Sequence, residues 1–140
     1  MSRAMGLDIG TKTIGVAMSD PMYWIAQPHT TVQRKTQEED LQTLEQLIRD
    51  YEVSDIVVGL PFHMNHTKGS SADRSETFAR LLEQRCSIPV FMQDERLSTV
   101  SAERVLTESG VKGRKKKKEH IDAVAATFIL QTWLDRRAQS

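Results

Sequence analysis

The chain has 140 residues, which is near the modal size of a single domain with one sizeable core. Hydrophobic residues make up 39% and charged residues 27% of it, a composition typical of a globular protein rather than a disordered or fibrous one. The sequence contains neither an apolar run of the roughly 20 residues that cross a bilayer nor a secretory signal. Its one cysteine, Cys86, excludes an internal disulfide framework. We therefore expect one domain, residues 1–140, in the cytoplasm and without a membrane partner.

The charged residues are unevenly distributed, although the formal net charge is zero. Residues 99–140 carry 9 Lys and Arg against 5 Asp and Glu, whereas residues 1–98 carry 10 against 14. Most of the basic excess lies between Lys112 and Lys118. A mildly acidic body is thus predicted to carry a basic C-terminal portion.

The first half of the chain predicts three strands and a helix. Two short apolar strands, residues 3–9 and 13–19, are separated by too little chain for a helical crossover. We expect an antiparallel hairpin in which Gly10 is free to take a positive φ. A third strand follows within residues 26–33. Thr36 and Glu39 then form a capping box before leucines at helical spacing, which predicts a helix.

The second half alternates strands and helices. The apolar run of residues 56–60 is typical of a central strand covered on both faces. The elements expected after it are a polar loop at 61–71, a helix at 71–84, a strand at 89–93, a helix from Ser98 or Thr99 to Gly110, a basic loop at 112–118 and a last helix at 119–137. The order βββ-α-β-α-β-α-α predicts an α/β fold with a mixed five-stranded sheet and helices packed on it.

Three acids next to apolar residues stand out as candidate catalytic or metal-binding groups. Asp8 lies inside the first strand, Glu95 just past the strand at 89–93, and Asp122 in the expected first turn of the last helix. A carboxylate between Leu7 and Ile9 is costly to bury unless it is paired or bound to a metal. Oxygen ligands alone would favour Mg²⁺ or Mn²⁺ over Zn²⁺. The alternative is that these acids are surface or ion-pairing residues, such as Glu95 with its neighbour Arg96.

Candidate nucleic-acid contacts lie in three other stretches. The basic run at 112–118 could neutralise phosphates, although such runs are also common in solvated loops. The turn that contains Lys12 could contact a phosphate or be a plain hairpin turn, and it lacks the spacing of a P-loop. The polar loop at 61–69 is long for a compact domain, which suggests ligand contact through Asn65 and Lys68.

The motifs taken together resemble those of the YqgF/RuvX family, described as Holliday junction resolvases and as nucleases that process the 5′ end of precursor 16S ribosomal RNA. The matching stretches are Leu7-Asp8-Ile9-Gly10-Thr11-Lys12-Thr13-Ile14-Gly15-Val16-Ala17, Val58-Gly59-Leu60-Pro61, Met64-Asn65, Asp94-Glu95-Arg96-Leu97-Ser98-Thr99 and Ile121-Asp122-x-x-Ala125-Ala126 with Ile129-Leu130-Gln131. One departure is His66, where the family usually has glycine, and it affects the loop rather than the acids.

The resemblance implies an RNase H-like fold and metal-dependent phosphodiester hydrolysis with Asp8, Glu95 and Asp122 as the acidic triad. Asp8 would bridge two Mg²⁺ or Mn²⁺ ions about 3.5–4 Å apart, and the other two acids would complete the site. The predicted substrate is precursor 16S rRNA, branched DNA or both; a four-way junction would require paired active sites and hence a homodimer. The residues predicted to contact nucleic acid are Lys12, Asn65, Lys68, Arg96, Lys112, Arg114, Lys115, Lys116, Lys117 and Lys118.

Two other functions are compatible with parts of the sequence. A non-catalytic ribosome-maturation factor would keep the fold and bind nucleic acid without efficient turnover. An ATP-binding domain of the actin or hexokinase kind shares the Asp-x-Gly-Thr turn between two strands. That class needs a second lobe to close over the nucleotide, which a single domain of this length does not provide.

Overall fold

The sheet of the computed structural model has five strands, and the structure describes residues 2–60, 70–94 and 114–138. The strands are β1 (Arg3–Ile9), β2 (Thr13–Ser19), β3 (Ala26–Gln33), β4 (Val53–Leu60) and β5 (Val90–Asp94), and their order in the sheet is β3-β2-β1-β4-β5. The β1–β2 and β2–β3 pairs are antiparallel, whereas β1–β4 and β4–β5 are parallel. The predicted mixed five-stranded sheet is therefore confirmed.

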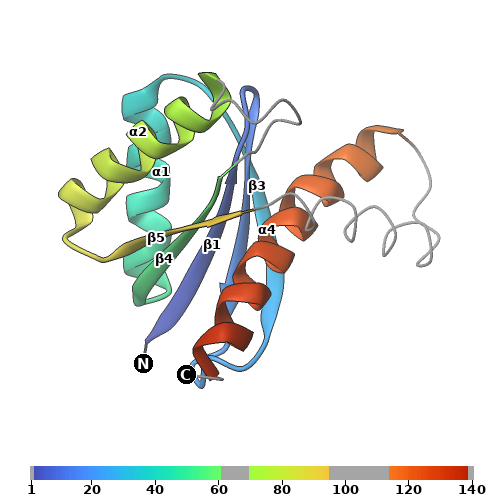
Figure 1. Cartoon of the computed structure of the whole chain (residues 1–140). Helices are drawn as coiled ribbons and strands as arrows, with labels where there is room; N and C mark the ends of the chain where they lie inside the picture. Colours follow the sequence, from blue (N-terminus) through green and yellow to red (C-terminus); the bar gives the residue numbers. More distant parts are fainter. Residues whose placement is uncertain (1, 61–69, 95–113, 139–140) are drawn as a thin grey trace.

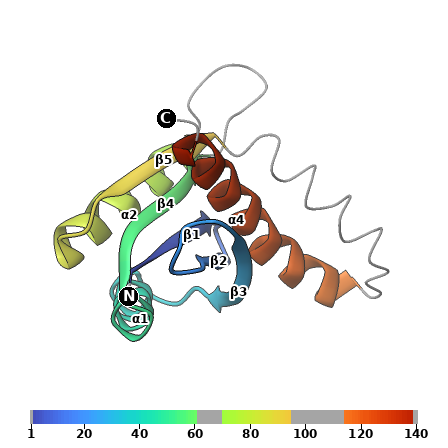
Figure 2. The same ribbon diagram turned by 90° about the horizontal axis from the view of Figure 1, so that it is seen from below.

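Helices cover both faces of this sheet. Helices α1 (Gln37–Asp50) and α2 (Ser70–Cys86) lie on one face and α4 (Arg114–Ala138) lies on the other (Figure 1, Figure 2). None of the helices within the described ranges has the length and apolarity of a membrane-spanning segment. The helix predicted between Ser98 and Gly110 lies outside the described residues.

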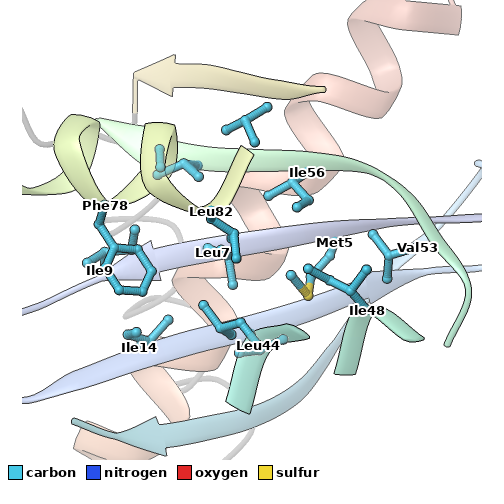
Figure 3. Close-up of a cluster of buried hydrophobic side chains, with 14 of the residues drawn as sticks. Met5, Leu7, Ile9, Ile14, Leu44, Ile48, Val53, Ile56, Phe78 and Leu82 are labelled. Carbon is cyan, nitrogen blue, oxygen red and sulfur yellow. The ribbon is translucent and has the colours of Figure 1, made fainter. Parts of the chain in front are cut away.

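Side chains alternate along β1, so successive residues lie on opposite faces of the sheet. Met5, Leu7 and Ile9 enter a large core beneath α1 and α2, where they meet residues such as Leu44 and Leu82 (Figure 3). The residues that alternate with them, Ala4, Gly6 and Asp8, therefore face α4. Ala4 packs there in a second, smaller cluster with Ala17, Val57, Ala126, Ile129, Leu130 and Leu134.

Gly6 allows α4 to pack very closely against β1. A Cβ atom at this position would lie 2.8 Å from the carbonyl oxygen of Ala126 and 2.8 Å from Cβ of Leu130. Real Cβ atoms do not come so near other heavy atoms, so even an alanine would push the helix away. The glycine thus determines where α4 crosses the sheet.

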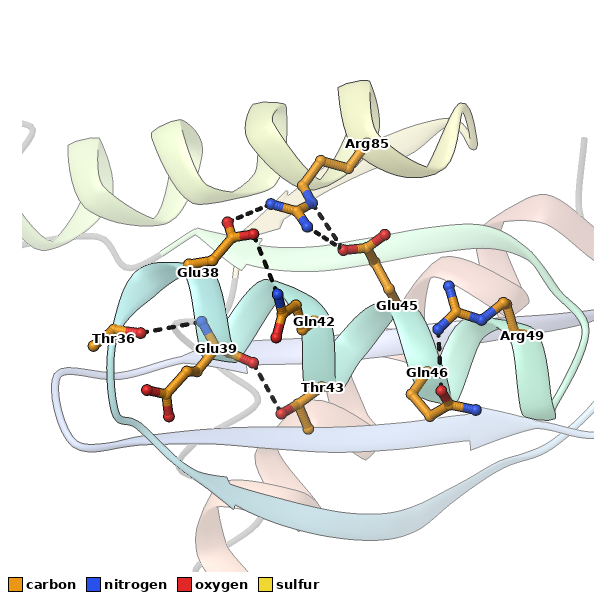
Figure 4. A network of polar contacts seen from close by, with 9 residues as sticks. All are labelled: Thr36, Glu38, Glu39, Gln42, Thr43, Glu45, Gln46, Arg49 and Arg85. Atoms are coloured by element: carbon orange, nitrogen blue, oxygen red, sulfur yellow. Dashed lines mark hydrogen bonds and ion pairs between the residues drawn. The ribbon is translucent and has the colours of Figure 1, made fainter.

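Polar contacts at α1 link it to its own N-terminus and to α2. The Thr36 side chain accepts a hydrogen bond from the Glu39 amide at 3.1 Å, which confirms the predicted N-cap. Arg85, near the end of α2, forms ion pairs with Glu38 and Glu45 of α1 (Figure 4). Its hydrogen bond to Glu38 lowers the pKa of that carboxyl group. These surface pairs orient the two helices but, being exposed, contribute little to stability.

The β1–β2 hairpin forms as predicted, and the φ angle of Gly10 lies outside the left-handed region that glycine was free to adopt there. Its amide donates to the Thr13 carbonyl at 2.8 Å, and a Cβ would lie 3.0 Å from that same oxygen. Glycine is favoured here by this close approach, because any side chain would crowd the turn.

The start of the last helix also differs from the prediction. Residues 114–118 were expected in a loop, and they form the first turns of α4 instead. Arg and Lys are good helix formers, and neither glycine nor proline interrupts the chain between Arg114 and Ala138. Asp122 consequently lies eight residues after the start of α4 and not in its first turn.

Candidate active site

Asp8 lies one residue before the end of β1, opposite Gly15 of β2. Its side chain is partly buried. Leu7 and Ile9 are buried on the opposite face of the sheet, which leaves Asp8 on the face of α4 and partly open to solvent. An ionised carboxylate is far less costly in this position than inside the core.

The parallel strands bring a second acidic segment to the same edge of the sheet. Because β1, β4 and β5 are parallel, their C-terminal ends lie at one edge. The last residue of β5, Asp94, pairs with Leu60 at the end of β4. Glu95 is the next residue in the chain and lies outside the described residues. The strand that precedes it nevertheless ends at the edge where Asp8 is found.

Helix α4 packs on β1 and extends past this edge of the sheet. Its turn at Ala126 packs on Gly6, and the first turns of the helix extend beyond the sheet (orange in Figure 1). Asp8 lies two residues beyond Gly6, about 6.6 Å along the strand. Asp122 lies four residues before Ala126, about 6 Å along the helix and on the same side of it. The backbone at Asp122 is therefore level with Asp8, on the face of the sheet that Asp8 occupies.

The predicted cationic contacts are only partly within the described structure. Lys12 is exposed in the hairpin directly after β1, and residues 114–118 start α4 at the same end of the molecule. Asn65, Lys68, Arg96 and Lys112 lie outside the described residues. The hairpin and the start of α4 thus flank the edge at which Asp8 lies.

The hairpin is held in place by Arg34, a residue that the sequence did not single out. Its Nη1 donates to the Gly10 carbonyl oxygen at 2.8 Å, and its amide donates to the Lys12 carbonyl at 2.9 Å. Its Nε lies 3.1 Å from Oδ2 of Asp40, whose side chain is only 2% exposed. The hairpin that follows Asp8 is in this way tied to α1. No sequence pattern reveals this pair, because its geometry depends on how the chain turns between β3 and α1.

The described side chains contain no group of three or more His, Cys, Asp or Glu that could hold a metal ion. Of the predicted triad only Asp8 belongs to them. The metal site made by Asp8, Glu95 and Asp122 therefore stays a prediction.

Comparison with known proteins identifies the family. The model of the RuvX family, described as Holliday junction resolvase, matches residues 2–136. The chain belongs to the RuvX family. A relative from Shouchella clausii, named "Putative pre-16S rRNA nuclease", is 49% identical over 99% of this chain and 98% of its own length. Another of that name, from Moorella thermoacetica, is 50% identical with the same coverage.

The solved structures agree with the RuvX assignment at the level of the fold. Thermus thermophilus RuvC in complex with a Holliday junction substrate matches with a TM-score of 0.65 and 12% identity, over 100% of this chain and 98% of that one. The predicted RNase H-like fold and the family resemblance are thus confirmed. The family and the names of its members also confirm the predicted class of protein, a nuclease that hydrolyses phosphodiester bonds.

Proposed function

We propose that this RuvX protein is a divalent-metal-dependent endonuclease with Asp8, Glu95 and Asp122 as its catalytic acids. The observation that carries the proposal is the register of α4 on β1, which brings the backbone at Asp122 level with Asp8. In the proposed site the two acids, from distant parts of the chain, share one face of the sheet near the edge where β5 leads into Glu95. Carboxylates that converge in this way would need a cation to offset their repulsion.

The donor chemistry fits a hard divalent cation. The acids offer only oxygen ligands, and the partial exposure of Asp8 leaves it accessible to a hydrated ion. Mg²⁺ or Mn²⁺, one ion or two, would activate water and stabilise the charge on the leaving oxygen. Lys12 and the basic residues 114–118 flank the same edge, where they can hold the phosphates of the bound strand.

The proposed substrate is structured nucleic acid, with the 5′ end of precursor 16S rRNA favoured over branched DNA. Two relatives that are 49% and 50% identical to this chain, over 98% of their own length, are named "Putative pre-16S rRNA nuclease". Processing of that RNA would place the protein in the cytoplasm. Branched DNA remains the second substrate, and its resolution would require a homodimer with two paired sites.

A direct comparison of substrates tests this function. Purified protein is incubated with a fragment spanning the 5′ end of precursor 16S rRNA and, separately, with a four-way DNA junction, with Mg²⁺ or Mn²⁺ and with EDTA. We expect cleavage of the RNA that requires the metal and falls by at least about a hundredfold in Asp8→Asn. The matched control is Asp50→Asn, which removes an exposed carboxylate at the end of α1.

Two outcomes would contradict the proposal. Full metal-dependent cleavage by correctly folded Asp8→Asn would show that this acid has no catalytic role. Binding of RNA without turnover, unchanged in Glu95→Gln, would favour a non-catalytic maturation factor.

A further inference from the structure

A small cavity beside the β1–β2 hairpin has a lining suited to an anion. Its volume is about 250 Å³, and its lining residues come from the segment between β3 and α1, the first residue of α1, and α2. Its walls are two arginines, one amide, one hydroxyl and one aromatic ring, from Arg34, Arg74, Gln37, Thr77 and Phe78. No carboxylate lines it within the described residues.

Two other cavities of the described structure differ in this respect. The one between β3 and α1 is lined by Glu39 and Asp40 among others. The one near the β2–β3 turn includes Asp20 in its wall. Carboxylates in a cavity wall repel an anion. None of the described residues that line the cavity at Arg34 and Arg74 is an acid, and Asp40, which binds Nε of Arg34, is not among them.

Arg34 is held rigidly at the edge of this cavity. Its guanidinium lies 5.2 Å from the centroid of the buried Phe78 ring, and Asp40 and Gly10 bind its Nε and Nη1. These two hydrogen bonds use two of the five N–H donors of the group. The remaining donors are fixed in direction, and a preorganised guanidinium loses little entropy when it binds phosphate.

The cavity lies close to the proposed active site, on the other side of the hairpin. Gly10, whose carbonyl Arg34 contacts, follows Asp8 by two residues, which is about 7 Å of chain. Asp8 faces α4, whereas Arg34 and Phe78 lie on the side of α1 and α2, and Lys12 is exposed in the turn between them. A nucleic-acid strand that crosses the hairpin would pass these three places in order. The cavity therefore lies along the path of a strand that is bound at Asp8.

We infer that this cavity is a phosphate-binding subsite, in which Arg34 and Arg74 hold a backbone phosphate of the strand that is bound at Asp8. The inference rests on the proposed function, since it needs a nucleic-acid substrate. It assigns to the side of α1 and α2 a role in substrate binding in addition to its packing role.

Binding to the cleavage-deficient Asp8→Asn protein tests the subsite separately from catalysis. The probe is a fluorescently labelled fragment of the 5′ end of precursor 16S rRNA, titrated at several salt concentrations without added divalent metal. Arg74→Ala should weaken binding about tenfold at low salt, since a charge-assisted hydrogen bond is lost. It should also reduce the slope of log K against log salt by about 0.7–0.9, the value for one phosphate contact.

The matched control is Arg80→Ala, which removes the same charge from the same helix. Arg80 is exposed, forms an ion pair with Glu83 and does not line the cavity. A second variant, Gln37→Glu, puts a carboxylate between the two arginines at the first position of α1, where a negative charge does not destabilise the helix. It should weaken binding at least as much as Arg74→Ala, whereas Gln42→Glu, on the same helix but outside the cavity, should not.

The inference is wrong if Arg74→Ala binds RNA with the affinity and salt slope of Arg80→Ala, or if Gln37→Glu binds like Gln42→Glu. Such a result would leave the proposed nuclease function standing when the wild-type protein still cleaves. Absence of cleavage by the wild-type protein, together with RNA binding that depends on Arg74, would instead contradict the nuclease function and keep the subsite.

Discussion

The two faces of the sheet differ in the size of the residues that build them. The face beneath α1 and α2 is filled with large aliphatic side chains such as Leu7, Leu44 and Leu82. The face beneath α4 uses Ala4, Gly6, Ala17 and Ala126 where helix and strands approach most closely. Large side chains supply buried area, whereas small ones bring backbones together and fix their relative position. We propose that the first face mainly stabilises the domain and that the second mainly positions the proposed catalytic acids.

The largest expected effect on stability comes from the first face. Leu44→Ala removes a side chain that is 0% exposed and should lower the free energy of unfolding by about 3 kcal/mol, within a usual range of about 2–5. Cleavage by the molecules that remain folded should change by less than about twofold, because α4 is untouched. Urea unfolding and cleavage assays well below the transition measure the two quantities. A large loss of activity in folded protein would show that this face also positions the site.

Gly6→Ala should have a smaller effect on stability and a larger one on activity. The added Cβ meets the Ala126 carbonyl and Leu130, both at 2.8 Å, and should cost about 1–3 kcal/mol of stability. Displacement of α4 moves Asp122 relative to Asp8, so cleavage should fall by about tenfold or more. The same unfolding and cleavage assays apply. Activity equal to that of Leu44→Ala would remove the distinction between the two faces.

The third prediction concerns Gln131 and tests how α4 is anchored to the sheet. Its side chain accepts from the Ala26 amide at 2.8 Å and donates to the Trp24 carbonyl at 3.0 Å, so it joins the helix to the start of β3. Gln131→Leu leaves these groups without their partner and should cost about 1–2 kcal/mol in urea unfolding. Thr132→Ala is the control, since the Thr132 hydroxyl bonds only within the helix, to the Phe128 carbonyl. Equal stability of the two variants would show that this contact does not anchor α4.

The smallest expected effect is at the N-cap of α1. Thr36→Ala removes the acceptor of the Glu39 amide and should lower stability by about 1 kcal/mol. Thr36→Ser keeps a hydroxyl at this position and should restore most of the loss. Cleavage should be unchanged in both variants. A loss of activity in Thr36→Ala alone would indicate that the start of α1 takes part in the reaction.

Local patterns in the sequence predicted most of the sheet and of α1. The bounds of β1 and β2 and the cap at Thr36 agree with the structure because hydrophobic alternation and capping chemistry act over only a few residues. The start of α4 differs from the prediction because the helix propensity of Arg and Lys outweighs the like charges of this run.

The site was harder to predict from the sequence than the fold. Asp8 was identified correctly as a strand residue, but its exposure depends on which face of the sheet it occupies. The role of Gly6 and the bond between Arg34 and Gly10 arise from contacts between residues 24 to 124 positions apart. Such contacts are set by packing of the whole domain, and no local motif encodes them.

The central claim is that the packing of α4 on β1 unites Asp8 and Asp122 in one metal site. Calorimetric titration with Mn²⁺ of the wild type, Asp8→Asn and Asp122→Asn tests it directly, with Asp135→Asn as the control for charge at the far end of α4. We predict that both site variants bind Mn²⁺ at least about tenfold more weakly than the wild type, since each lacks a ligand, and that the control binds normally. Wild-type affinity in Asp122→Asn, with Asp8→Asn impaired, would contradict the claim.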